Sequence, residues 1–225
     1  MSTPDQTDKK KNPFLRIAAY RTGISMLGPG LRSAVWVQGC PFHCPGCIAP
    51  DWLPFNSPAL EISPKELCSP LLANPQISGL TLSGGEPFAQ AEALAALVSL
   101  ARQKRELDII CFSGYRFEAL LNNPPNPGVF ALLDQIDVLI DGAYIEAQND
   151  GRGMRGSNNQ RIIHFTNRLR GYDFENQPRR AEIVIQSGGM FMVGVPPKNV
   201  LFSLDKLKPE SFDQFILKAT SHERA

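Results

Sequence analysis

No stretch of this 225-residue sequence approaches the roughly 18 uninterrupted apolar residues that a membrane-spanning helix needs. The chain also lacks an excess of charge of either sign, since 23 Lys and Arg residues oppose 22 Asp and Glu residues for a formal charge of +1. That balance gives no electrostatic basis for binding nucleic acid or a membrane surface. Residues 1–12 are polar and offer no signal-peptide core. We therefore expect a cytoplasmic protein.

Cysteine is scarce as well, with five residues in the whole chain, three of them within eight positions. Thiols so few and so clustered do not make a secreted disulfide framework, and in a reducing compartment they indicate metal or redox chemistry. Hydrophobic residues make up 43% of the chain, enough for a core. The length favours one domain, at roughly 100–200 residues each, with a short appendage.

Apolar segments typical of strands alternate with segments typical of helices along the middle of the chain. We expect strands at 33–38, 77–82, 107–112, 138–140 and 161–165, a strand pair at 182–186 and 190–195, and helices at 63–73, 90–104, 117–121 and 211–220. The alternation predicts right-handed βαβ units and a mostly parallel α/β sheet. Residues 40–47, 83–86, 113–114 and 141–142 follow strands and are expected to gather at one rim.

The most informative peptide is CPFHCPGC, residues 40–47. Cys40, Cys44 and Cys47 are separated by three and then two residues, and a loop rich in proline and glycine can turn all three sulfurs toward one point. Thiolates bind zinc, copper(I) or iron–sulfur clusters. A structural zinc site takes four ligands, usually as two separated pairs, and no second pair is present. Three ligands on a four-iron cluster leave one iron open. Zinc and a chance grouping of buried cysteines remain alternatives.

The spacing Cys-x3-Cys-x2-Cys is the signature of radical S-adenosylmethionine (SAM) enzymes, and further peptides narrow the resemblance. These are GPGLR at residues 28–32, LSGGEP at 82–87, DVLIDG at 137–142 and RGSNNQ at 155–160. In this order they resemble the activating proteins of anaerobic ribonucleoside-triphosphate reductase, over roughly residues 17–165, about two thirds of the chain.

The resemblance implies a fold, cofactors and partners. The fold would be a partial, incomplete TIM-like (β/α) barrel. Cys40, Cys44 and Cys47 would hold a [4Fe–4S] cluster whose open iron is chelated by SAM, and reductive cleavage of SAM would give methionine and a 5′-deoxyadenosyl radical. The partner would be a large glycyl-radical enzyme of the anaerobic ribonucleotide reductase type. The electron donor would be flavodoxin- or ferredoxin-like.

The resemblance also implies which residues contact SAM, and it assigns no residue a catalytic role beyond binding. The turn Ser83-Gly84-Gly85-Glu86 would do so because glycine lets the backbone approach closely and a carboxylate can accept hydrogen bonds from the methionine ammonium. Backbone at Gly46, Cys47 and Ile48 would line the adenine side. The further candidates are Ser113, Asp141 and Arg155. A helix cap, an Asp-Gly turn and a solvated loop are their respective alternatives.

We expect a disordered tail at residues 1–13, a radical SAM core at 14–165 and a C-terminal extension at 166–225. Trp36 and Trp52 are expected to serve core or loop packing. The leading hypothesis is an enzyme that installs a glycyl radical on a large partner. The alternatives are a radical SAM enzyme acting on a small molecule or another polypeptide, and a non-catalytic [4Fe–4S] protein that only carries electrons.

Overall fold

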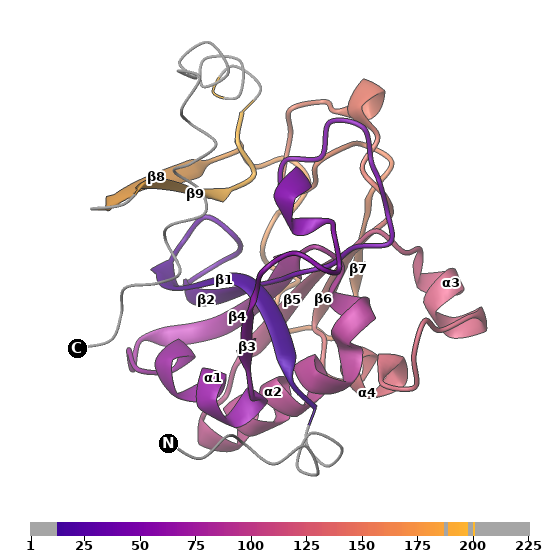
Figure 1. Ribbon diagram of the computed structural model, residues 1–225. Helices are drawn as coiled ribbons and strands as arrows, with labels where there is room; N and C mark the ends of the chain where they lie inside the picture. Colours follow the sequence, from indigo (N-terminus) through magenta and orange to yellow (C-terminus); the bar gives the residue numbers. More distant parts are fainter. Residues whose placement is uncertain (1–12, 187–188, 198–199, 201–225) are drawn as a thin grey trace.

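The computed structural model describes residues 13–186, 189–197 and 200 of the chain. An open seven-stranded sheet with the strand order β3-β1-β2-β4-β5-β6-β7 lies at its centre, and a separate two-stranded sheet, β8-β9, follows in the chain (Figure 1). The strands are β1 (Leu15–Ile24), β2 (Leu31–Val37), β3 (Leu60–Ile62), β4 (Ile77–Gly84), β5 (Asp108–Ser113), β6 (Val138–Asp141), β7 (Arg161–His164), β8 (Ala181–Gln186) and β9 (Gly189–Gly194). The helices are α1 (Pro64–Leu71), α2 (Ala91–Lys104), α3 (Phe117–Asn122) and α4 (Val129–Leu133), with short 3₁₀ helices η2 (Pro50–Trp52), η3 (Pro87–Gln90) and η4 (Glu146–Gln148).

Strands β2, β4, β5 and β6 pair in parallel and form the centre of the large sheet. Strands β1, β3 and β7 pair antiparallel toward its two edges, so the sheet is mixed around a parallel centre. The predicted α/β class is confirmed, and each strand expected between residues 33 and 165 matches an observed strand to within a few residues. The expected strand pair is the antiparallel β8–β9 hairpin.

Helix α1 begins as its sequence predicts. The hydroxyl of Ser63 accepts a hydrogen bond from the backbone N–H of Glu66 at 3.2 Å, while the Glu66 carboxylate accepts one from the Ser63 backbone N–H at 3.0 Å. Pro64 occupies the first helical position, where its missing N–H costs nothing. Leu67 and Leu71 lie one turn apart and are fully buried, so the helix packs this stripe into the core.

The four helices contribute to one large core on one face of the sheet, together with alternate strand residues such as Val35, Leu82 and Ile109. The intervening residues of the same strands point to the opposite face because side chains alternate along a strand. That face is covered by later parts of the chain, through Met154, Leu169, Phe174 and Val193. Figure 1 shows the β8–β9 hairpin beside β1 and β2, on the side of the sheet away from α1 and α2.

The sequence did not predict β1, β3 or α4. Strand β1 is ten residues long, and Leu15 and Ile17 are fully buried, but charged Arg16 and Arg21 and two alanines weaken its apolar alternation. The expected helix at 211–220 and nearly all of the expected disordered tail lie outside the described residues. Across the residues that are described, none of the helices combines the length and apolar character that crossing a bilayer requires.

Candidate cofactor site

Four strand ends meet at one rim of the sheet, as the alternation predicts. Hydrogen bonds join them in sequence. The backbone N–H of Glu86, which follows β4, donates to the carbonyl of Gly39, which follows β2, at 2.8 Å. The backbone N–H of Gly142, which follows β6, donates to the carbonyl of Ser113 at the end of β5 at 3.0 Å. The Ser113 hydroxyl donates to the Glu86 carboxylate at 3.0 Å. The cysteine loop, the Gly-Gly-Glu turn, Ser113 and Asp141 are therefore brought together by direct contacts.

The cysteine loop starts at the end of β2 and returns to it. The backbone N–H of Gly39 donates to the carbonyl of Trp52 at 2.9 Å, and that of Cys40 donates to the carbonyl of Leu53 at 2.8 Å. Within the loop, the N–H of Cys47 donates to the carbonyl of Cys44 at 3.1 Å and closes a turn. Residues 39–53 thus form a closed loop, the cysteine loop, whose two ends are joined by backbone hydrogen bonds.

Two contacts dock this loop onto the neighbouring strand ends. The ring of Phe42 packs edge-to-face against Tyr115, with 4.8 Å between ring centroids, and a Cβ added to Gly114 would collide with Phe42. Gly46 has a φ of +73°, and a Cβ there would lie 2.9 Å from the Glu146 carboxyl carbon. Glycine at 46 and 114 lets the loop lie directly on the rim.

Two of the three thiols in the loop have raised pKa values. Cys40 is buried, whereas Cys44 and Cys47 are half-buried. Burial raises the pKa of Cys40 to about 12, against a backbone hydrogen bond from Phe42 that lowers it, and the negative charges of Glu86, Cys44 and Cys47 raise it further. Burial likewise raises the pKa of Cys47. Such thiols deprotonate readily only beside a positive charge, which a bound metal centre supplies.

The donor set of the loop fits an iron–sulfur cluster. In the described part of the chain, no three His, Cys, Asp or Glu side chains are arranged to hold a single metal ion. A cubane makes a different demand, because each thiolate bonds a separate iron and the sulfurs lie around the cluster. Cys40, Cys44 and Cys47 offer three soft ligands on one loop, which suits that arrangement.

Glu86 is fully buried and its carboxylate is held by three donors. It accepts hydrogen bonds from the backbone N–H of Phe88 at 2.9 Å, the backbone N–H of Gly114 at 2.7 Å and the Ser113 hydroxyl at 3.0 Å. Burial raises the pKa of Glu86 to about 7, although these donors oppose the shift. A carboxylate offers about four lone-pair sites, so one is left for a further donor.

The glycines before Glu86 serve the protein backbone itself. Gly84 has a φ of +105°, and a Cβ there would collide with the backbone of Val37. A Cβ on Gly85 would collide with the Gly39 carbonyl and would lie 2.9 Å from the carbonyl of Trp52. Both glycines are thus required for the turn after β4 to lie against the end of β2 and the returning cysteine loop.

Asp141 is buried at the end of β6 and is engaged by protein groups on both oxygens. It accepts a hydrogen bond from the Phe117 backbone N–H at 2.7 Å, which caps the start of α3. It also pairs with Arg161 through Nε at 2.9 Å and with Arg116 at 3.4 Å. Arg161 in turn donates two hydrogen bonds to Glu118, at 2.9 and 2.7 Å. This network fixes β6, β7 and α3 relative to one another.

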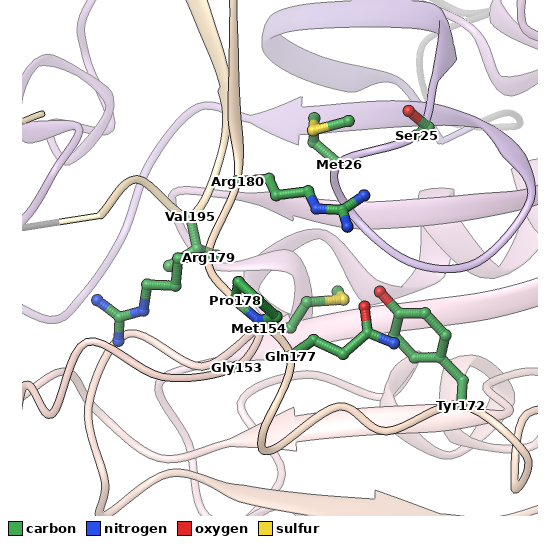
Figure 2. A pocket seen from close by; sticks show the side chains of 10 residues that line it. All are labelled: Ser25, Met26, Gly153, Met154, Tyr172, Gln177, Pro178, Arg179, Arg180 and Val195. Atoms are coloured by element: carbon green, nitrogen blue, oxygen red, sulfur yellow. The ribbon is translucent and has the colours of Figure 1, made fainter.

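Arg155 lies in the polar loop 151–160, and its guanidinium bonds to Asn158 of that loop at 2.8 Å, to Asp150 just before it at 3.2 Å and pairs with Glu175 at 4.0 Å. The loop is held from outside by Arg179, whose buried side chain donates to the carbonyls of Arg155 at 2.7 Å and Gly156 at 2.9 Å. Burial lowers the pKa of Arg179. Figure 2 shows that Arg179 and its neighbour Arg180 extend to opposite sides of the chain.

The remaining predicted positions differ in exposure. Ile48 is 56% exposed and follows Cys47 directly within the cysteine loop. Ser83 is half-buried and lies beside Trp36 in the parallel ladder of β2 and β4. Of the other two predicted positions, Gly46 is exposed and Cys47 is half-buried.

Two glutamines, Gln38 and Gln90, hold segments around the site together by hydrogen bonds. Sequence reasoning did not identify them. The Gln90 side chain accepts from the Arg16 backbone N–H at 2.8 Å and donates to the Gln38 carbonyl at 2.9 Å. The Gln38 side chain donates to the carbonyl of Pro54 at 2.9 Å, beyond the cysteine loop. These residues are far apart in the sequence, so no local pattern could reveal them.

The GPGLR segment lies elsewhere, at the start of β2 rather than its carboxyl end. Arg32 is fully buried there, and its guanidinium donates to the Thr81 hydroxyl at 2.9 Å and the Leu80 carbonyl at 2.8 Å and pairs with Asp108. A Cβ on Gly28 would collide with Ile110 and crowd the Arg32 side chain. The segment therefore locks the opposite end of the sheet and contributes no group to the rim.

A family model described as a 4Fe-4S single cluster domain matches residues 26–163. The chain is also similar to the anaerobic ribonucleoside-triphosphate reductase-activating protein of Vibrio cholerae, with 36% identity over 146 residues, which is 62% of this chain and 91% of that protein. The protein of the same name from Enterobacteria phage T4 is 34% identical over 151 residues, 65% of this chain and 92% of that protein. The pyruvate formate-lyase-activating enzyme of Streptococcus mutans is 38% identical over 85 residues, 36% of this chain and 32% of that enzyme.

The match with the reductase-activating proteins covers nearly their whole length, and the range matched by the family model includes the cysteine loop and the rim. The cofactors of this group are a [4Fe–4S] cluster and SAM. The chain accordingly belongs to the family of the anaerobic ribonucleoside-triphosphate reductase-activating proteins, which are radical SAM activating enzymes of the oxidoreductase class.

Proposed function

We propose that this enzyme cleaves SAM reductively and uses the resulting 5′-deoxyadenosyl radical to generate a glycyl radical on a partner of the anaerobic ribonucleotide reductase type. The observation that carries the proposal is the placement of the cysteine loop. Three thiols lie on one closed loop, and hydrogen bonds and the Phe42–Tyr115 contact fix that loop over the rim where Glu86 and Ser113 meet. The names of the relatives support the choice of partner.

Cys40, Cys44 and Cys47 are the proposed cluster ligands. When bound, the cluster and SAM supply the one-electron cleavage of a sulfonium bond that protein side chains cannot perform. The remaining lone-pair site of Glu86 is proposed to accept a hydrogen bond from the SAM ammonium. The turn Ser83-Gly84-Gly85 is proposed to carry the ligand on its backbone.

The residues around the loop orient the cofactors and limit water. Backbone at Gly46 and Ile48 is proposed to lie along the adenine, and the exposed side chain of Ile48 can cover it from solvent. Ser113 and Asp141 are proposed to act at the same rim, Ser113 by holding Glu86 and Asp141 by fixing the start of α3. Arg155 is proposed to present its loop to the SAM carboxylate or to the partner.

Residues 14–165 are the proposed radical SAM core, and 166–225 the proposed C-terminal extension. The end of the family match at residue 163 supports this division. The parallel centre of the open sheet, with all four helices on one face, is compatible with a partial (β/α) barrel. A flavodoxin- or ferredoxin-like donor is proposed to reduce the cluster. Because thiol ligands persist in a reducing compartment, the proposed location is the cytoplasm.

The test is SAM cleavage by the anaerobically reconstituted, chemically reduced protein. Wild type should release methionine and 5′-deoxyadenosine, and Cys44→Ala should release neither. Cys68→Ala is the matched control, because Cys68 is a buried cysteine of α1 outside the loop, and it should behave as wild type. Absence of both products from the wild type would refute the enzymatic proposal and favour simple electron transfer.

A second arm of the experiment tests the partner. The reduced protein is mixed with SAM and an anaerobic ribonucleotide reductase, and the glycyl radical is followed by EPR. A glycyl radical signal that requires both SAM and this chain is the expected result. Cleavage of SAM without such a signal would assign the chain to a radical SAM enzyme with another substrate.

A further inference from the structure

Three aromatic side chains from distant parts of the sequence meet beside the cysteine loop. Trp36 lies in β2, Trp52 at the end of η2 and Phe191 in β9. The ring centroids of Trp36 and Trp52 are 6.1 Å apart, those of Trp36 and Phe191 5.4 Å, and those of Trp52 and Phe191 6.3 Å, the last pair being stacked. The central sheet, the cysteine loop and the C-terminal hairpin therefore share one aromatic cluster.

Within this cluster, Trp52 is the member tied to the cofactor site. Its backbone carbonyl accepts the hydrogen bond from Gly39, the residue before Cys40, at 2.9 Å. The same carbonyl lies so close to Gly85 that a Cβ there would be 2.9 Å away. The position of Trp52 thus sets where the loop leaves β2 and how the Gly-Gly-Glu turn fits under it.

The hairpin that carries Phe191 is well anchored on the sheet. Val193 is fully buried in one core with Ile24, Leu27 and Ala34, and the Arg21 guanidinium lies over the Phe191 ring, 5.0 Å from its centroid. The cavity left between the β1–β2 connection and the extension is only about 30 Å³ (Figure 2). Met26 of that connection and Arg180 and Val195 of the extension line this cavity.

We propose that the β8–β9 hairpin is a positioning element for the cysteine loop, and that Phe191 acts by stacking on Trp52. The hairpin lies beyond residue 163, where the family match ends, so this device is an addition to the matched core. The inference rests on the proposed function, since it takes the loop to be the cluster-binding loop.

The test measures how firmly the loop holds iron. Wild type, Phe191→Ala, Phe191→Tyr and Ile183→Ala are loaded anaerobically, and the loss of cluster absorbance to an iron chelator is timed. Removing the ring eliminates two aromatic contacts, so Phe191→Ala should lose iron roughly tenfold faster, whereas Phe191→Tyr keeps the ring and should stay within about twofold of wild type. Ile183 is exposed on the same hairpin, and Ile183→Ala should match wild type.

A double-mutant cycle tests whether Phe191 acts through Trp52. If it does, adding Phe191→Ala to Trp52→Leu should not accelerate iron loss further, whereas independent effects would multiply. The EPR spectrum of the reduced, SAM-treated protein should change in Phe191→Ala and not in Ile183→Ala. Should Phe191→Ala fail to fold, Phe191→Leu keeps the apolar volume without the ring and should also lose iron faster than wild type.

The outcomes separate this inference from the proposed function. A wild type that holds no cluster would contradict the proposed function and the inference together. Two results would overturn only the role of the hairpin. One is that wild type and Phe191→Ala lose iron at the same rate, and the other is that the effects of Phe191→Ala and Trp52→Leu on that rate multiply.

Discussion

The hydroxyl of Ser113 donates a hydrogen bond to the buried carboxylate of Glu86 at 3.0 Å, and this bond joins the ends of two neighbouring parallel strands. The same carboxylate accepts from the backbone of Gly114 and Phe88. The residue expected to meet the SAM ammonium is thereby also the residue that holds the rim together. Stability and the proposed contact with SAM therefore involve the same side chain.

Glu86→Ala should lower the free energy of unfolding by about 3 kcal/mol. The reason is that the donors at Phe88, Ser113 and Gly114 lose the carboxylate that accepts their hydrogen bonds. Urea unfolding of the cofactor-free protein measures the change. Glu92→Ala is the control, since Glu92 is exposed on α2, and it should have little effect. Unchanged stability in Glu86→Ala would show that the carboxylate does not hold the rim.

Arg32→Met should destabilise the protein by about 3–5 kcal/mol, because it breaks the pair between the buried guanidinium and the half-buried Asp108, leaves that carboxylate without its partner and removes the bonds to Thr81 and Leu80. Lys104→Met, at an exposed position of α2, is the matched control for loss of a positive charge. Denaturant unfolding reports stability, and a separate titration reports SAM affinity. A variant with wild-type stability that binds SAM poorly would show that the GPGLR segment is a ligand site after all.

The ion pair of Glu118 with Arg161 predicts a dependence on pH. Hydrogen bonds from Arg161 lower the pKa of Glu118 from its ordinary 4.5 to about 2 in the folded protein. A lowered folded pKa gives a stabilisation that is present above about pH 4.5 and is lost as the pH falls toward 2. The urea midpoints of wild type and Glu118→Gln should therefore differ most at pH 7, approach each other below about pH 4.5 and converge near pH 2. A difference independent of pH would exclude this pair as its source.

Arg179→Met should loosen the loop at 149–156, because three hydrogen bonds to Asn149, Arg155 and Gly156 disappear together. Hydrogen exchange followed by mass spectrometry should show amide exchange in this loop roughly tenfold faster or more. Arg179→Lys should not restore protection, since a single ammonium cannot reach the acceptors of a planar guanidinium. Arg180→Met provides an exposed control. Equal exchange in all variants would contradict the assigned role.

Local sequence signals predict the parallel centre of the fold well. Ser63 and Glu66 cap helix α1 through contacts within one turn. The apolar runs of β4 and β5 likewise indicate strands without reference to a distant partner. Strand β1 escapes prediction because its apolar side chains are separated by arginines, and its pairing with β2 and β3 decides its conformation. Tertiary context outweighs local propensity there.

The same distinction holds at the site. The spacing of Cys40, Cys44 and Cys47 and the Gly-Gly-Glu turn are contiguous motifs, so the sequence places them at one rim. The bracing side chains Gln38 and Gln90 and the stacking of Phe191 on Trp52 join positions 52 to 139 residues apart, and no pattern within one segment can reveal them. The contacts of Gly84 and Gly85 are equally non-local, since their neighbours are backbone atoms of β2 and the returning loop.

The EPR spectrum of the anaerobically reconstituted, reduced protein, recorded before and after adding SAM, tests the central claim most directly. Three thiolates on a four-iron cluster leave one iron for SAM, so a [4Fe–4S] signal should be present and should change when SAM is added. Cys40→Ala, Cys44→Ala and Cys47→Ala should each lose that response. A signal that SAM leaves unchanged, or a protein that takes up zinc in place of a cluster, would contradict the account.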